Sequence, residues 1–305
     1  MNKIASGIYP VMITPFSKNG GIDFEAVDRL TEFYIRNGCH GIFAVCQSSE
    51  MFFLTEDERV SLARRVAEAA KGRVSVVASG HVSDNPEDQI RELRRISETG
   101  VDGVVLVSNR LAKQDESDDV LIENLQKILT SLPCVTFGMY ECPHPYKRLL
   151  SEKVLSFMAE SGRFAFIKDT SCDASLIEKR VKLLDGRIQL FNANSATFLD
   201  TLKSGADGFS GIMANFYPDI LVWLYENYKI HPEKAERLQP VLSLLSGVER
   251  GYYPVNCKYH MNLIGVPMEI ITRTRSHEYL SQLDKLEMEH LVKVENEIRK
   301  ALQSE

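Results

Sequence analysis

The chain has 305 residues, of which 44% are hydrophobic and 26% charged, and its formal net charge is −6 at pH 7. This is the composition of a globular protein, and the acidic balance argues against a nucleic-acid binder or a basic protein of membrane surfaces. The first residues lack a long apolar signal segment, and no stretch approaches the roughly 18 apolar residues that cross a bilayer. The cysteines form no CxxC pair, so we expect reduced thiols in a cytoplasmic protein; they are Cys39, Cys46, Cys134, Cys142, Cys172 and Cys257.

Short apolar runs recur along the first two thirds of the chain. Nearly continuous apolar runs of this kind are typical of parallel strands that are buried on both faces. The eight runs are IYPVMITPF (8–16), GIFAVC (41–46), VSVVASG (74–80), GVVLVS (103–108), CVTFGMY (134–140), FAFIKDT (164–170), IQLFNAN (188–194) and GFSGIM (208–213).

The segments between the runs carry helix signals. Thr55 and Glu58 form a capping box, in which each side chain can satisfy a free backbone donor of the other residue. Asn85 precedes Pro86, which places a capping side chain before a proline at the first helical position. Strands that alternate with such helices predict parallel βα units.

Eight βα units without a linker predict a (β/α)8 barrel over residues 1–218, with a doubly wound sheet as the alternative. After residue 218 the sequence shows no further strong strand. It indicates several helices, including 232–247 and 277–302. We therefore expect residues 219–305 to form a C-terminal helical region packed on the barrel.

In such a barrel the active site lies at the C-terminal ends of the strands. This rule selects a set of polar residues that directly follow the apolar runs. They are Thr14, Gln47 to Glu50, His81, Ser108 to Arg110, Tyr140 to Cys142, Lys168 to Thr170, Asn192, Asn194 and Ser210.

Lys168 follows Phe164 to Ile167 directly and is the strongest candidate. A desolvated lysine loses proton affinity and becomes a nucleophile that can form a Schiff base with a carbonyl substrate. The alternative is a lysine that begins a loop, reaches water and pairs with Asp169.

Tyr140 ends the preceding strand, and since adjacent strands lie roughly 5 Å apart, its phenol can meet the amine and move protons. Packing on the barrel rim is the alternative for Tyr140.

His81 ends the third strand, where it is either an acid–base group or substrate contact, or simply a histidine in a polar loop. Cys46, Cys142 and Cys172 also fall at or just beyond strand ends. With His81 they offer soft metal ligands, but no spacing supports a metal site, so we expect small buried thiols and no metal.

These residues resemble the dihydrodipicolinate synthase / N-acetylneuraminate lyase family over about residues 5–300. "IYPVMITPF" is similar to the family's opening strand, and Cys46 to Glu50 stands where the family has G-[ST]-T-G-E. "MYECP" resembles Y-x-x-P around the catalytic tyrosine, "FIKDTS" resembles the segment around the Schiff-base lysine, and "SGADGFSGIMAN" resembles the entry to the last strand.

The resemblance implies a class I aldolase or dehydratase acting on 2-oxo acids, with no cofactor other than the covalent imine on Lys168. Tyr140 would relay protons, Ser48 and Ser49 with their amides would hold the substrate carboxylate, and Glu50 would tie the loop down. The implied substrate-binding set is Gln47, Ser48, Ser49, Ser210 and Ile212. The residues expected to set substrate specificity are His81, Arg110, His144, Asn192 and Asn194, with Asn109 and Tyr146 as further candidates.

Several departures argue against the family's best-known reactions. Gln47 replaces the hydroxyl residue that passes protons to the tyrosine, and an amide is a poor relay. "VSNRLA" lacks the tyrosine that the synthase lends to a neighbouring subunit. Pro145 stands in place of the synthase's carboxylate-binding arginine, the nearest arginine being Arg148, and Ser195-Ala196 replaces the acidic pair of the sialic-acid lyase.

The leading hypothesis is therefore a Schiff-base lyase for another 2-oxo acid, such as a 2-keto-3-deoxy sugar acid that yields pyruvate. The alternatives are a non-catalytic scaffold that binds a small acid and a metal-dependent barrel lyase. The resemblance also implies a homotetramer built as a dimer of dimers.

Overall fold

The computed structural model describes residues 4–303, and in this part of the chain eight parallel strands form a nearly closed barrel. The sheet order is β1-β8-β7-β6-β5-β4-β3-β2. The strands are β1 (Gly7–Ile8), β2 (Gly41–Val45), β3 (Ser75–Ser79), β4 (Gly103–Val107), β5 (Phe137–Tyr140), β6 (Phe164–Asp169), β7 (Gln189–Asn192) and β8 (Gly208–Phe209). The predicted (β/α)8 barrel is confirmed, and the doubly wound sheet is excluded.

β1 and β2 stand at the two ends of this sheet order, and the chain just beyond β1 contacts β2 and so closes the barrel. Val11 bridges Phe43 in parallel register. The Phe43 amide donates to the Pro10 carbonyl oxygen at 2.9 Å, and the Met12 amide donates to the Phe43 carbonyl oxygen at 3.0 Å. The apolar run 8–16 is nevertheless mostly outside regular strand, because Pro10 and Pro15 have no N–H to donate to a ladder.

Other strands are also shorter than their apolar runs, among them β5 and β8. β5 begins only at Phe137, since residues 133–135 still belong to the turn after the preceding helix. β8 ends at Phe209, and the chain then turns into the 3-10 helix η3 (Ile212–Asn215). The end of the run 208–213 therefore forms part of the barrel mouth instead of a strand.

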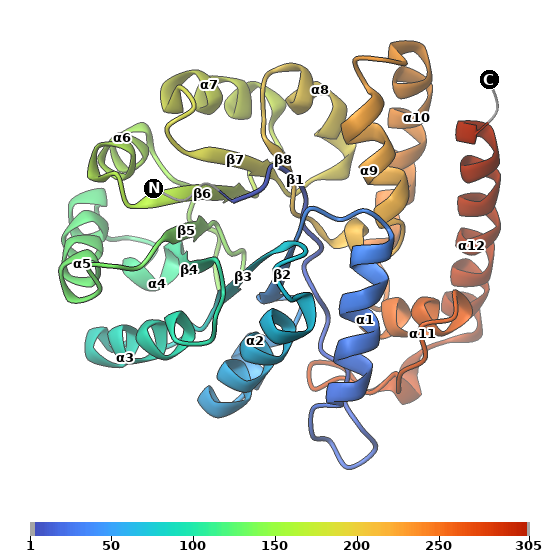
Figure 1. Cartoon of the computed structure of the whole chain (residues 1–305), viewed down its shortest axis with the longest axis horizontal. Coiled ribbons are helices and arrows are strands. Elements are labelled where there is room, and N and C mark those ends of the chain that lie inside the picture. Colours follow the sequence, from blue (N-terminus) through green and yellow to red (C-terminus); the bar gives the residue numbers. More distant parts are fainter. Residues whose placement is uncertain (1–3, 304–305) are drawn as a thin grey trace.

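Helices surround the strands as a ring (Figure 1). The capping signals are confirmed: Thr55 and Glu58 form both bonds of the capping box, and Asn85 accepts from the amides of Glu87 and Asp88. The ring helices are α1 (Phe24–Arg36), α2 (Glu56–Ala70), α3 (Pro86–Ser97), α5 (Asp118–Ser131), α6 (Glu152–Ser161), α7 (Ala174–Leu184), α8 (Phe198–Lys203) and α9 (Pro218–Asn227), with the short α4 (Ser108–Leu111) directly after β4.

The C-terminal region lies on one side of the ring, where Figure 1 shows α10 (Pro232–Leu245), α11 (Val255–Leu263) and α12 (Gln282–Gln303). A 3-10 helix, η4 (Ser246–Arg250), continues α10 and packs against η3 at the end of β8. The predicted helix 232–247 matches α10, whereas the predicted helix 277–302 covers the 3-10 turn His277–Tyr279 and then α12, which begins only at Gln282. No helix within residues 4–303 is long and apolar enough to span a membrane.

Candidate active site

Tyr140 and Lys168 face each other at the ends of β5 and β6. The two residues are partners in the parallel register, as the strand order implied. The Lys168 Nζ lies 4.4 Å from the centroid of the Tyr140 ring and 5.4 Å from that of Phe43. The amine is thus surrounded by aromatic faces and sits directly beside the phenol.

Lys168 is buried, with only 5% of its surface exposed. Its neighbour Asp169 does not pair with it, because the Asp169 carboxylate binds Arg180 and Ser171. Burial lowers the pKa of Lys168 to about 8, although the nearby groups Cys46, Cys142 and Glu249 act in the opposite direction. The structure therefore excludes a solvated lysine paired with Asp169 and provides a desolvated amine.

We expect the reaction of Lys168 with a carbonyl compound to accelerate as pH rises through about 8. Below this pH the amine is protonated and has no free electron pair, whereas above it the neutral nucleophile predominates. The measurement is the rate of borohydride-trapped pyruvate adduct between pH 6 and 10, read by intact mass. A midpoint near 10.5, the ordinary lysine pKa, would show that the amine is solvated in solution.

Tyr140 is also buried, and its ring packs edge-on against Phe43 with centroids 5.8 Å apart. Burial raises the pKa of the Tyr140 phenol well above its ordinary value. The hydroxyl is therefore neutral at physiological pH. In this form it can donate a proton to a developing oxyanion, but it is a weak proton acceptor.

A cavity of about 460 Å³ opens above the pair. The loops after the strands supply one part of its wall, including Gln47, Ser48, His144 and Ile212. The C-terminal region supplies another part, with Glu249, Tyr253, Thr274 and Arg275. The volume is in the range of pockets that enclose small ligands.

The loop after β2 presents only part of its polar sequence to this cavity. Gln47 and Ser48 line it, and the Gln47 Oε1 accepts a hydrogen bond from the Cys142 thiol at 3.3 Å. Ser49 is buried, and its hydroxyl bonds to the Cys46 amide and carbonyl within the loop. The Ser49 side chain thus shapes the loop, and Ser48 is the hydroxyl of this stretch that faces the cavity.

Glu50 anchors the same loop to the C-terminal region. Its Oε2 accepts the amides of Arg273 and Thr274, both at 2.7 Å. The buried amine of Lys258 lies 3.9 Å from Oε1 and donates to the Thr14 carbonyl oxygen at 2.6 Å. These contacts confirm the expected structural role of Glu50 and explain why Thr14 is buried here.

The two candidates from the last strand lie at different depths. Ile212 lines the open cavity. Ser210 is buried and lines a small space inside the barrel, below the cavity and next to Lys168 and Phe43. Ser210 is therefore within the neighbourhood of the amine, while Ile212 contributes to the wall above it.

His81 and Arg110 do not line the cavity. His81 is fully buried, and its Nδ1 accepts the Val107 amide at 3.0 Å. Burial lowers the pKa of His81 to about 4, so the ring is neutral. The Arg110 guanidinium pairs with Asp84 at 2.6 Å and covers the outer face of Phe52, which itself lines the cavity.

The asparagine candidates hold loops in place. Asn192 is fully buried and donates to the hydroxyls of Thr197 and Thr201, each at 3.0 Å. Asn194 caps the short 3-10 helix Ser195–Thr197 by accepting the Ala196 amide. Asn109 donates to three carbonyl oxygens of the loop after β5, those of Cys142, His144 and Tyr146.

That loop brings His144 to the cavity, where its ring packs against Phe52 with centroids 5.1 Å apart. Tyr146 points the other way and donates to the carbonyl oxygens of Asn109 and Ala112. Arg148 also points away, toward Asp118 at the start of α5. Arg148, the arginine nearest in sequence to the position of the synthase's carboxylate-binding arginine, therefore does not reach the cavity.

The cysteines are all free, and four of them are buried. Cys46 and Cys142 lie near Lys168, as small buried thiols. Cys172 differs from the expectation, because it is exposed and lines the cavity in a left-handed backbone conformation with φ 61°. No cluster of three or more His, Cys, Asp or Glu side chains within residues 4–303 is arranged to hold a metal ion.

A buried ionic network supports the ends of β5 and β6 from behind. The Arg180 guanidinium on α7 binds the Asp169 carboxylate and lies 2.9 Å from the Glu141 carboxylate. Glu141 accepts the amides of Leu150 and Thr170 in turn. Because Glu141 follows Tyr140 and Asp169 follows Lys168, the network fixes the backbone beside both candidate catalytic residues.

The C-terminal wall residues were not among the predicted site residues. Glu249, Tyr253 and Arg275 lie far from any strand in the sequence, and the strand-end rule does not select them. The segment "GVERGYYP" between two predicted helices carried the only local signal, a break rich in glycine and aromatic residues.

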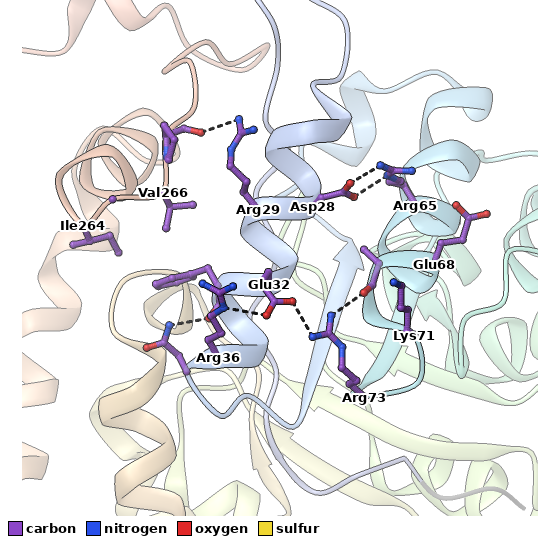
Figure 2. Close-up of a pocket in the computed structure, with 15 residues that line it drawn as sticks. Asp28, Arg29, Glu32, Arg36, Arg65, Glu68, Lys71, Arg73, Ile264 and Val266 are labelled. Carbon is purple, nitrogen blue, oxygen red and sulfur yellow. Dashed lines mark hydrogen bonds and ion pairs between the residues drawn. The ribbon is translucent and has the colours of Figure 1, made fainter.

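A second, larger depression of about 1140 Å³ lies on the outer surface between α1, α2 and residues 264–267 (Figure 2). Figure 2 shows that ion pairs occupy its floor, including those of Arg65 with Asp28 and of Arg73 with Glu32. It lies toward the ends of α1 and α2 that lead into β2 and β3, away from Lys168. The smaller cavity at the strand ends is therefore the candidate active site.

The strand ends of this (β/α)8 barrel present a buried lysine, a neighbouring buried tyrosine and a polar loop, and the fold and site together define a barrel scaffold of the lyase class. The sequence model of the "Dihydrodipicolinate synthetase family" matches residues 4–294, and the chain belongs to this family.

The relatives are distant. The chain is 26% identical to a 4-hydroxy-tetrahydrodipicolinate synthase of Methanococcus aeolicus, over 86% of this chain and 89% of that protein. It is 28% identical to an uncharacterized DapA-like lyase of Pyrococcus abyssi, over 79% and 81% of the two chains.

Solved structures share the fold. Dihydrodipicolinate synthase DapA-2 of Bacillus anthracis superposes with a TM-score of 0.87 at 21% identity, over 96% of this chain and 99% of that chain. YagE, a prophage protein of E. coli K12 from the same family, in complex with pyruvate, gives 0.86 at 21% identity, over 95% and 98%.

Proposed function

We propose that this protein is a Schiff-base-forming lyase, an aldolase or dehydratase, that acts on a 2-oxo acid. The observation that carries the proposal is the desolvated Lys168 amine, which lies beside the Tyr140 phenol at the floor of a cavity of ligand size. Family membership supports it, since relatives are named as synthases and as a lyase.

In this proposal the Lys168 amine attacks the 2-oxo carbon of the substrate, and loss of water gives the imine. Tyr140 donates a proton to the departing oxygen. Ser48, which faces the cavity with Gln47, holds the substrate carboxylate through neutral donors. The covalent imine then serves as the electron sink, so the reaction needs no other cofactor.

The residues of the cavity wall support a choice of substrate class. Gln47, His144 and Thr274 are hydrogen-bonding groups that suit a polyhydroxylated chain, and no arginine stands where the synthase binds its second carboxylate. We therefore propose a 2-keto-3-deoxy sugar acid or a related substrate that yields pyruvate. Dihydrodipicolinate synthesis and sialic-acid cleavage are disfavoured by the replacements at Pro145 and at Ser195-Ala196.

The test is borohydride trapping with a panel of 2-oxo acids, pyruvate included, followed by intact mass and peptide mapping. We expect a single pyruvate-dependent adduct on Lys168 that is absent from Lys168→Ala. No adduct in the wild-type chain would refute the proposal, and an adduct that persists in the variant would place the reacting amine elsewhere. Product analysis with 2-keto-3-deoxy sugar acids then separates cleavage from dehydration.

We also propose that the chain acts as a homotetramer in the cytoplasm, as the family resemblance implied. Sedimentation velocity should then give a species of four times the 34.5 kDa chain mass. A monomer at micromolar concentration would contradict this part of the proposal and leave the chemistry untouched.

A further inference from the structure

Glu249 is a carboxylate in the cavity wall that the strand-end chemistry does not use. It lies on η4, which packs against η3 and so sits over the end of β8. The residue is half-buried and lines the same cavity as Lys168 and Tyr140. The C-terminal region therefore places one acidic group above the two candidate catalytic residues of the barrel.

Within the described part of the chain, the Glu249 carboxylate makes no hydrogen bond or ion pair that would give it a structural role. Among the side chains of residues 4–303 it takes part in no hydrogen bond or ion pair, unlike Glu50, whose Oε2 accepts two amides, and Glu141, which binds Arg180 and backbone amides. The charged and titratable groups that act on it electrostatically are Lys168 from the barrel and Arg250 on its own element, and Tyr217 senses its charge in turn. A carboxylate that is left free at a cavity wall is available to a bound ligand.

Several other groups near the amine are poor proton acceptors, and two stronger ones make other contacts: the His144 ring packs against Phe52, and Glu50 accepts the amides of Arg273 and Thr274. The Tyr140 phenol stays neutral because burial raises its pKa well above the ordinary value, and a neutral phenol is a weak proton acceptor. Gln47 is an amide whose Oε1 is already occupied by the Cys142 thiol. The thiols of Cys46 and Cys142 are buried, and burial raises their pKa as well.

We propose that Glu249 is the catalytic base of the site, which takes a proton from C3 of the substrate imine on Lys168. In the protonated imine the C3–H bond breaks, its electron pair forms the C2=C3 double bond, and the C=N electron pair moves onto the nitrogen, which leaves the C–N single bond of a neutral enamine. The proton resides on the Glu249 carboxylate and returns to C3 in the reverse step. This inference rests on the proposed function, because it requires the imine.

Burial raises the pKa of Glu249 above its ordinary value of 4.5, which brings the carboxylate closer to the pH at which it must work. The base form is lost as pH falls through this pKa. We therefore expect the proton-transfer rate to decline on the acid side, and we expect this decline to disappear when the carboxylate is removed.

Pyruvate serves as the probe, because its imine exchanges methyl protons with D₂O each time the enamine forms. The exchange is followed by proton NMR with Lys168→Ala as the blank. Glu249→Gln keeps the shape of the side chain, and the matched control is Glu160→Gln, which removes one exposed carboxylate on α6. Borohydride trapping is run on every variant in parallel.

We expect Glu249→Gln to form the trapped adduct as the wild type does, while its exchange rate falls by about 10²–10⁴-fold. Glu249→Asp should recover part of the rate, and Glu160→Gln should match the wild type. Exchange in Glu249→Gln within about threefold of the wild type would overturn the inference. The inference would also be overturned by a folded Glu249→Gln variant that no longer forms the adduct, or by a wild-type protein that forms the adduct without exchange. A wild-type protein that forms no adduct would refute the proposed function itself.

Discussion

Replacement of Tyr140 by phenylalanine is expected to slow imine formation with pyruvate by about 10²–10⁴-fold, the usual contribution of a positioned proton donor. The Lys168 Nζ lies over the Tyr140 ring, 4.4 Å from its centroid. Phenylalanine keeps the edge-on packing against Phe43, so the loss falls on proton transfer and not on the fold. The measurement is the rate of borohydride-trapped adduct after rapid mixing.

The control for this variant is Tyr228→Phe, which removes a hydroxyl that bonds the Leu202 carbonyl oxygen on the outside of the barrel. It should leave the rate unchanged. If Tyr140→Phe also forms the adduct at the wild-type rate, Tyr140 is a packing residue of the barrel rim and another group supplies the proton. Together with Glu249→Gln, this variant separates the step that forms the imine from the step that forms the enamine.

Replacement of Arg180 by methionine should cost about 3–5 kcal/mol of stability, because removal of one partner from a buried ionic network leaves uncompensated charge. Arg180 is 3% exposed, and its loss leaves Glu141 and Asp169 buried together without a cation. At about 2 cal/mol/K of unfolding entropy per residue, this corresponds to a fall in Tm of roughly 5–8 °C. Calorimetry or thermal circular dichroism measures it.

Arg180→Lys should lose part of this stability, since an ammonium keeps the charge but not the planar fork that reaches both carboxylates. Arg94→Met on the exposed face of α3 is the matched control and should stay within about 0.5 kcal/mol of the wild type. A Tm for Arg180→Met that equals the Arg94→Met value would show that the network carries no net stability. Because Arg180 fixes the residues that follow Tyr140 and Lys168, the destabilised variant should also trap pyruvate more slowly.

The strand-end rule selected Lys168 and Tyr140, which both line the cavity, but it did not separate side chains that face the cavity from structural ones. His81, Asn192 and Ser49 all lie at or just beyond strand ends, yet each is buried and bonded to backbone or neighbouring side chains. A strand end fixes only the position of a residue's backbone. Its side chain direction depends on loops from other parts of the chain, as the three carbonyl oxygens held by Asn109 illustrate.

The sequence by itself determined the order of strands and helices, because burial on both faces requires continuous apolar runs and helix caps require particular side chains at fixed spacing. It also determined that Lys168 and Tyr140 would be neighbours, since consecutive parallel strands pair. Only the tertiary structure decided that Glu249 and Tyr253 close the cavity. Their position depends on how η4 packs against η3 across a long separation in the chain, and no local pattern encodes a contact of that kind.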